Sequence, residues 1–166
     1  MSRILPGNQF DEKAYISFLV ELACRLNARC GQREKPNGDL QEYSGYSVRK
    51  EGLESAISSP FQSFGGTPRF VSPYDVAAAL LINIATGHPF QDGNKRTALH
   101  LALTYLNLHS IEVVPPSAEA GAKLAEDVVI NNGISYEDRR VSASRKFQAW
   151  TTPDQTALAH RNHASD

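Results

Sequence analysis

The densest run of reactive side chains in this chain lies at residues 88–96, which read His-Pro-Phe-Gln-Asp-Gly-Asn-Lys-Arg. The imidazole of His88 can accept a hydroxyl proton near neutral pH. The carboxylate of Asp92 suits Mg²⁺, an ion that binds through few protein ligands. Lys95 and Arg96 fall in the first turn of an expected helix, where exposed backbone N–H groups already favour an anion. This combination of groups is what phosphoryl transfer requires.

Other residues of this run invite structural interpretations. Gly93 would let the backbone pass close to a phosphate, because a Cβ would obstruct the approach. Phe90 lies between polar neighbours, and we expect it to turn inward and anchor the loop to the core. Asp92 could also cap the helix that follows. Residues 93–97 superficially resemble a Walker A loop, but its first glycine is absent and a helix precedes the segment, so we reject that motif.

Two strongly apolar helices are expected to flank the run. Residues 72–75 supply a hydroxyl cap, a proline at the first helical position and a carboxylate three residues after the cap, which predicts a helix to Thr86. Apolar side chains nearly encircle the second helix, from about Asn94 to His109. We therefore expect this second helix to be the central and most buried one.

The rest of the chain also reads as mostly helical. Helical periodicity predicts further helices at residues 11–29, 49–58 and 117–131, and another from 135 onward. A long polar loop is expected at 32–47, and aromatic residues among turn formers at 60–70 predict a β-hairpin, or flap. The predicted fold class is all-α, a compact bundle of about six helices with one small hairpin. The domain is expected to span 1–150, with a polar tail at 151–166.

Composition limits the classes of partner. The chain has 166 residues, with 17 Lys and Arg against 18 Asp and Glu, so neither a nucleic acid nor an anionic membrane is expected as its main partner. No apolar run is long enough for a signal peptide or a membrane span, which makes the cytoplasm the expected location. Cys24 and Cys30 match neither disulfide nor zinc spacing.

The four histidines outside the run show no metal-ligand spacing, and we interpret them as structural: they are His100, His109, His160 and His163.

The run resembles the signature of the Fic/Doc family, His-x-Phe-x-Asp/Glu-Gly-Asn-Gly-Arg-x-x-Arg. The positions that match in register are His88, Phe90, Asp92, Gly93, Asn94 and Arg96. Lys95 replaces the second glycine, and Leu99 stands where the final arginine belongs. Both departures resemble the death-on-curing (Doc) branch, in which Asn-Lys-Arg-Thr-Ala-Leu follows the acidic residue. The order of elements is also similar over about residues 10–150.

The resemblance implies a role for each matched residue. His88 would be the general base that deprotonates a hydroxyl of a target protein, and Asp92 would hold Mg²⁺ against the phosphates of ATP. Phe90 would be the buried anchor of the motif. The residues that bind the phosphates would be Gly93, Asn94, Lys95 and Arg96.

The resemblance also implies an activity. Members of the family transfer AMP from ATP to a protein hydroxyl, whereas the Doc branch transfers the terminal phosphate to a threonine of translation elongation factor Tu. Leu99 replaces the arginine that would grip the outer phosphates in AMP transfer, so a kinase is favoured. The chain is expected to be a Doc-like toxin of a toxin–antitoxin system that uses Mg-ATP, inhibits translation and is silenced by a cognate antitoxin.

Several alternatives stay open. The enzyme could transfer AMP, could use another nucleotide or a phosphocholine-type donor, or could be a catalytically idle binding module in a toxin–antitoxin complex. Residues 47–52 fit the family's inhibitory Ser/Thr-x-x-x-Glu-Gly/Asn spacing. The glutamate of that motif pairs with the signature's final arginine, and Leu99 stands at that position here, so we interpret the match as coincidence. Three aromatic residues of the flap could form a minor core or an edge for strand addition by a target: Phe61, Phe64 and Phe70.

Overall fold

The computed structural model describes residues 11–31, 37, 47–130 and 133–153. This part of the chain forms α1 (Glu12–Gly31), α2 (Lys50–Ser58), α3 (Pro73–Gly87), α4 (Asn94–Leu108), α5 (Ala118–Asp127) and α6 (Tyr136–Ala149). A 3₁₀ turn (Ser59–Phe61) and the strands β1 (Ser63–Phe64) and β2 (Thr67–Pro68) lie between α2 and α3. The predicted all-α fold with one small hairpin is confirmed.

Two predictions fall mostly on other residues, namely the long loop at 32–47 and the tail at 151–166, of which the structure describes little. Among the described residues, none of the helices combines the length and the apolar character needed to cross a bilayer.

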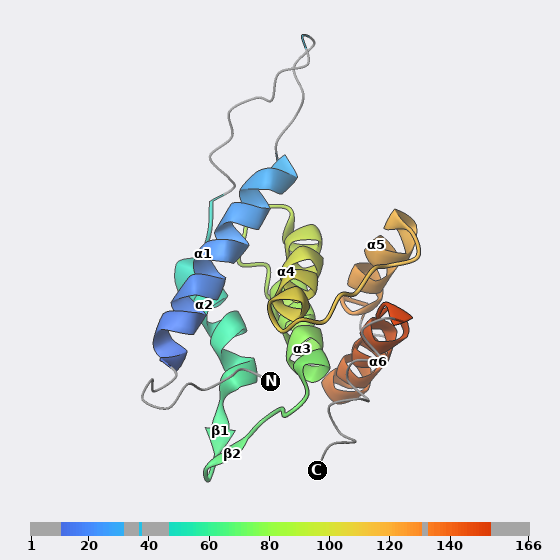
Figure 1. Cartoon of the computed structure of the whole chain (residues 1–166). Coiled ribbons are helices and arrows are strands. Elements are labelled where there is room, and N and C mark those ends of the chain that lie inside the picture. The colour runs from blue at the N-terminus through green and yellow to red at the C-terminus, as the bar shows by residue number, and fades with distance from the viewer. Residues whose placement is uncertain (1–10, 32–36, 38–46, 131–132, 154–166) are drawn as a thin grey trace.

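The helices form three layers, with α3 and α4 between α1 and α2 on one side and α5 and α6 on the other (Figure 1). The central helix is α3, in which nine of 15 residues are buried, against seven of 15 in α4. The expectation that residues 94–109 form the most buried helix was therefore wrong. The reason is that α4 presents Leu99 and Leu103 to a cavity and leaves Leu108 51% exposed.

Two side chains at the start of α3 cap this helix and connect it to α6. Ser72 caps the helix, since its Oγ accepts a hydrogen bond from the Tyr74 N–H at 3.2 Å. Asp75, which was expected to complete this cap, instead accepts from Arg140 Nη1 of α6 at 2.6 Å. Arg140 is buried and also bonds to Glu137. The carboxylate at the start of α3 thus docks α6 onto the central layer.

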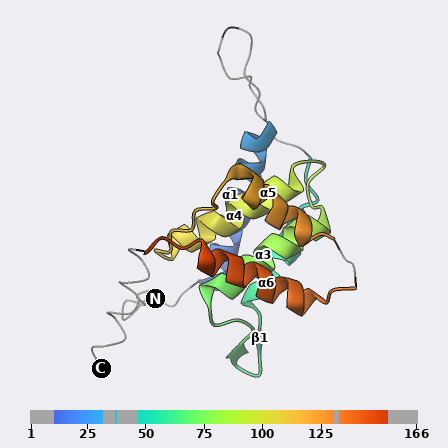
Figure 2. The same cartoon turned by 90° about the vertical axis from the view of Figure 1, so that its right-hand side faces the viewer.

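The predicted hairpin projects from the helical body (Figure 2). Ser63 pairs with Pro68 and Phe64 with Thr67. Gly65 and Gly66 occupy the turn with φ of +58° and +81°, a left-handed backbone that glycine adopts at little cost. The three aromatic side chains of this region differ in burial. Phe61 and Phe70 pack against the core, whereas Phe64 is 65% exposed.

The loop between α3 and α4 reverses the chain within six residues. Its first residue, His88, has a left-handed backbone with φ of +47°, and its last, Gly93, has φ of +75°. Phe90 lies between them with 3% of its surface exposed and belongs to the apolar core. The aromatic side chain therefore draws the middle of the loop into the protein, and the backbone polar groups around it must find partners there.

Two asparagine side chains supply these partners. Asn94 Oδ1 accepts from the Phe90 N–H at 2.9 Å, and Asn94 Nδ2 donates to the Phe90 carbonyl at 2.8 Å. Asn27, buried in α1, donates from Nδ2 to the Asp92 carbonyl at 2.9 Å and to Thr97 Oγ1 at 3.1 Å. These contacts tie the loop to both of the helices that pack beneath it.

We expect Asn94→Ala to lower the free energy of unfolding by about 2–4 kcal/mol, because it leaves the buried N–H and C=O of Phe90 without partners. Urea denaturation of the variant and the natural protein would measure this difference. Asn107→Ala is the matched control, since Asn107 is exposed on the same helix. The control should change stability by no more than about 0.5 kcal/mol. Equal losses in the two variants would contradict the assigned role of Asn94.

Candidate functional site

A cavity of about 840 Å³ lies at the N-terminus of α4, between that helix and α5. This volume is in the range of small-molecule sites. The structure brings six of the seven predicted site residues to its wall: His88, Asp92, Gly93, Asn94, Lys95 and Arg96. The seventh, Phe90, lies behind them in the core. The opposite wall comes from α5 and the segment before it, a part of the chain that the sequence analysis did not connect with the site.

His88 and Asp92 are both exposed at the edge of this loop. In the described part of the chain the His88 ring makes no hydrogen bond. Asp92 Oδ1 accepts from the Gly93 N–H at 2.7 Å, so this carboxylate does not cap α4, whose cap residue is Gly93. The other carboxylate oxygen bonds to none of the described residues. An imidazole and a carboxylate oxygen are thus available to a ligand at the same edge.

The N-terminus of α4 is arranged to receive an anion. No side chain caps it, so the N–H groups of its first turn have no intrahelical or capping acceptor. Lys95 and Arg96 add positive charge in this turn, where cations are ordinarily unfavourable. Arg96 Nη1 donates to the Cys30 carbonyl in the last turn of α1 at 3.3 Å, whereas Lys95 bonds to none of the described residues. Donors and charge together fit a phosphate group.

Asn94 lies on the cavity wall, but its side-chain amide is already hydrogen-bonded to the backbone N–H and C=O of Phe90. Its side chain therefore serves the loop, and its backbone N–H belongs to the helix terminus that faces the ligand.

The described residues contain no cluster of three or more His, Cys, Asp or Glu that could enclose a metal ion. Mg²⁺ needs no such enclosure, because it keeps several waters and is held by one or two carboxylates together with substrate phosphates. The Asp92 oxygen that bonds to none of the described residues lies beside an anion site and fits this mode of binding.

The deeper wall of the cavity is apolar. Leu99, at the position of the signature's final arginine, lies directly against α5, since a Cβ on Gly121 would be 3.1 Å from Leu99 Cδ2. Leu103, Ala122 and Ala125 continue this surface. No cation stands at position 99 to bind a second phosphate group.

The sequence analysis missed one residue of the site. His100, which we interpreted as structural, lines the cavity one helical turn after Arg96. Its pKa is below the ordinary value because the ring is partly buried, and the positive charges of Arg96 and Arg29 lower it further. The spacing of four residues from Arg96 was the available signal, since it places both side chains on one face of the helix.

The remaining histidines lie elsewhere. His109 packs on Tyr105, and its Nε2 is 3.3 Å from the Tyr15 hydroxyl. His160 and His163 lie outside the described residues.

The segment before α2 also supports the site. The Gln91 N–H donates to the Ser47 carbonyl at 2.9 Å, and the Arg49 N–H donates to the Pro89 carbonyl at 2.7 Å. Val48 and Phe90 form the antiparallel bridge between these two bonds. Part of the stretch whose inhibitory spacing we interpreted as coincidence is therefore a short strand-like brace on the loop.

Known proteins are similar to the part of the chain that carries this loop. The family model described as "Fic/DOC family" matches residues 15–106, which begin within α1, end within α4 and include the loop between the central helices. A protein of Mycolicibacterium smegmatis named "Toxin Doc" is 35% identical over 92 residues, which cover 55% of this chain and 67% of that protein. "Protein kinase doc" of Escherichia phage P1 is 31% identical over 78 residues, covering 46% of this chain and 62% of that protein. The chain therefore belongs to the Fic/DOC family.

Proposed function

We propose that this protein is a Doc-like toxin that transfers the terminal phosphate of Mg-ATP to a threonine or serine hydroxyl of a protein target, elongation factor Tu. One observation carries the proposal. A histidine, a carboxylate and an uncapped helix N-terminus with two cations line a single cavity, in which position 99 is leucine. The names of the two relatives, a toxin and a protein kinase, support the same reading.

Each group has a task in this reaction. The N–H groups of the first turn of α4, with Lys95 and Arg96, hold the phosphates and offset their charge. Asp92 is the residue that would hold Mg²⁺, which neutralises phosphate charge when it is bound. The hydrogen bond from Arg96 to the Cys30 carbonyl steadies one of the two cations. The cavity thus orients the terminal phosphate, and orientation with charge stabilisation supplies most of the catalysis in phosphoryl transfer.

The chemical step then needs a base. The oxygen of the target hydroxyl forms a bond to the terminal phosphorus, and the bond from that phosphorus to the bridging oxygen breaks. His88 takes the hydroxyl proton, and ADP leaves with the bridging oxygen. The exposed position of His88 at the cavity edge leaves room for a segment of a protein substrate.

Leu99 favours the terminal phosphate over AMP transfer. AMP transfer would require the outer phosphates to be held as the leaving group, and the apolar wall formed by Leu99 and α5 offers them no cation. The same proposal includes a separate antitoxin as the inhibitor, inhibition of translation as the effect and the cytoplasm as the place of action.

We expect purified elongation factor Tu to gain label from ATP labelled in the terminal phosphate when it is incubated with this protein and Mg²⁺. Intact-mass spectrometry should show the addition of one phosphate. His88→Ala should slow the transfer by about 10²–10⁴-fold, the usual contribution of general base catalysis.

Other outcomes of this experiment have definite meanings. Label that arrives from the α-phosphate would replace phosphate transfer with AMP transfer. Label on a different protein of a cell lysate would overturn the target. Growth inhibition that persists unchanged in His88→Ala would favour the catalytically idle binding module.

Donor binding should also be visible without catalysis. We expect Mg-ATP to raise the pKa of His100, because the bound phosphates offset the positive charge of Arg96 that lowers it in the free protein. NMR titration of the histidine rings would measure the shift, and Arg96→Ala should raise the same pKa without any nucleotide.

His109 is the control for this titration. Its pKa is lowered mainly by burial, and it does not line the cavity, so the nucleotide should leave it unchanged. If His100 does not respond to saturating Mg-ATP, the phosphates do not bind beside Arg96.

A further inference from the structure

Three consecutive carbonyl groups, from the last residue of α3 and the first two of the α3–α4 loop, accept hydrogen bonds from one residue, Arg49. Its Nη2 donates to the carbonyls of Gly87 and His88 at 2.7 and 2.8 Å, and its backbone N–H donates to the carbonyl of Pro89 at 2.7 Å. The Arg49 side chain is exposed, and the residue occupies the N-cap position of α2. The contacts converge on the backbone that carries the His88 side chain.

This backbone needs support from outside the loop. His88 has φ of +47° and ψ of +54°, a left-handed conformation that residues with a Cβ rarely adopt. The C-terminus of α3 leaves its last carbonyls without intrahelical donors. A guanidinium at this end supplies the missing donors and a favourable charge toward the negative end of the helix.

We propose that Arg49 is the positioning residue for His88, holding the direction of the imidazole toward the attacking hydroxyl without touching the substrate. The proposal rests on the proposed function, since it assigns His88 the task of general base. Arg49 does not line the cavity, so its loss should disturb the chemical step more than the binding of ATP.

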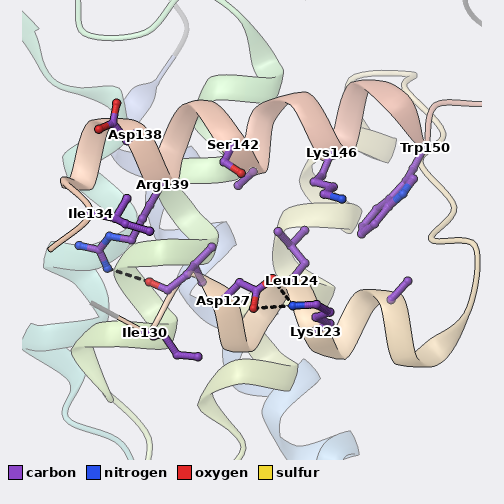
Figure 3. Close-up of a pocket in the computed structure, with 13 residues that line it drawn as sticks. Lys123, Leu124, Asp127, Ile130, Ile134, Asp138, Arg139, Ser142, Lys146 and Trp150 are labelled. Atoms are coloured by element: carbon purple, nitrogen blue, oxygen red, sulfur yellow. Dashed lines mark hydrogen bonds and ion pairs between the residues drawn. The ribbon is translucent and has the colours of Figure 1, made fainter. Parts of the chain in front are cut away.

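The chain contains a matched arginine that serves as the control. Arg139 Nη1 donates to the carbonyl of Val128, the cap residue at the C-terminus of α5, at 2.7 Å. Figure 3 shows this bond as a dashed line from Arg139, in a groove between α5 and α6. Both arginines therefore donate to a carbonyl at a helix end, but only Arg49 does so at the loop of His88.

The experiment compares kcat, the KM for ATP and the thermal midpoint of Arg49→Ala, Arg49→Lys and Arg139→Ala. For Arg49→Ala we expect kcat to fall at least tenfold, with the KM for ATP within twofold of the natural protein. Arg49→Lys should recover part of this loss, because an ammonium can donate to one of the two carbonyls. Arg139→Ala should keep kcat within twofold of the natural protein, even if its thermal midpoint falls as far as that of Arg49→Ala.

The proposal is overturned if Arg49→Ala keeps kcat within twofold of the natural protein. It is also overturned if kcat falls as much in Arg139→Ala as in Arg49→Ala. A rise in KM with kcat unchanged would also overturn it, because Arg49 would then act in binding. Complete absence of phosphate transfer by the natural protein would instead sink the proposed function.

If the natural protein transfers no phosphate, amide hydrogen exchange still tests the positioning role of Arg49. The Phe90 and Gln91 amides should exchange at least tenfold faster in Arg49→Ala than in Arg139→Ala, and equal rates would refute the positioning role.

Discussion

The reversal of the chain between α3 and α4 is the constraint on which the site depends. Phe90 is buried in the core, and a backbone drawn inward with it must keep its polar groups hydrogen-bonded. The Asn94 side chain bonds to the N–H and C=O of Phe90, and the Asn27 side chain donates to the carbonyl of Asp92. Arg49 donates to the three carbonyls before Phe90. Two layers of the protein, the outer one with α1 and α2 and the central one with α4, therefore shape one short loop, and the reactive side chains lie on the outer surface of that loop.

Local signals made the elements and the reactive run predictable, but the contacts that shape the loop join distant parts of the chain. The Ser72 cap marked the start of α3, and the spacing from His88 to Arg96 marked the chemistry. Asn27 lies 65 residues from Asp92, and nothing in the local pattern of either points to the other. The polar Asn27 four residues after the buried Ala23 was one usable sign, because a polar residue on a buried stripe needs a partner.

The error about α4 has a physical cause. The apolar residues around the whole of α4 predicted that this helix would be completely buried, yet some of them form the wall of a cavity. Leu99 approaches α5 closely because Gly121 has no side chain, and this contact brings α5 to the site. Neither residue indicates the other in the sequence. The contact of Leu99 with Gly121 joins the position at which the signature departs to a helix that the motif does not include.

Helix ends of opposite polarity meet across the loop, the carbonyl end of α3 at His88 and the amide end of α4 at Gly93. Much of the attraction for an anion is therefore built from backbone, which a change of side chain does not remove. In the proposed function, a copy of this protein that had lost its histidine would still fold around the same helix terminus and still hold the nucleotide. Such a copy would bind the donor without transferring its phosphate, so a single substitution would remove the reaction and leave the binding site in place.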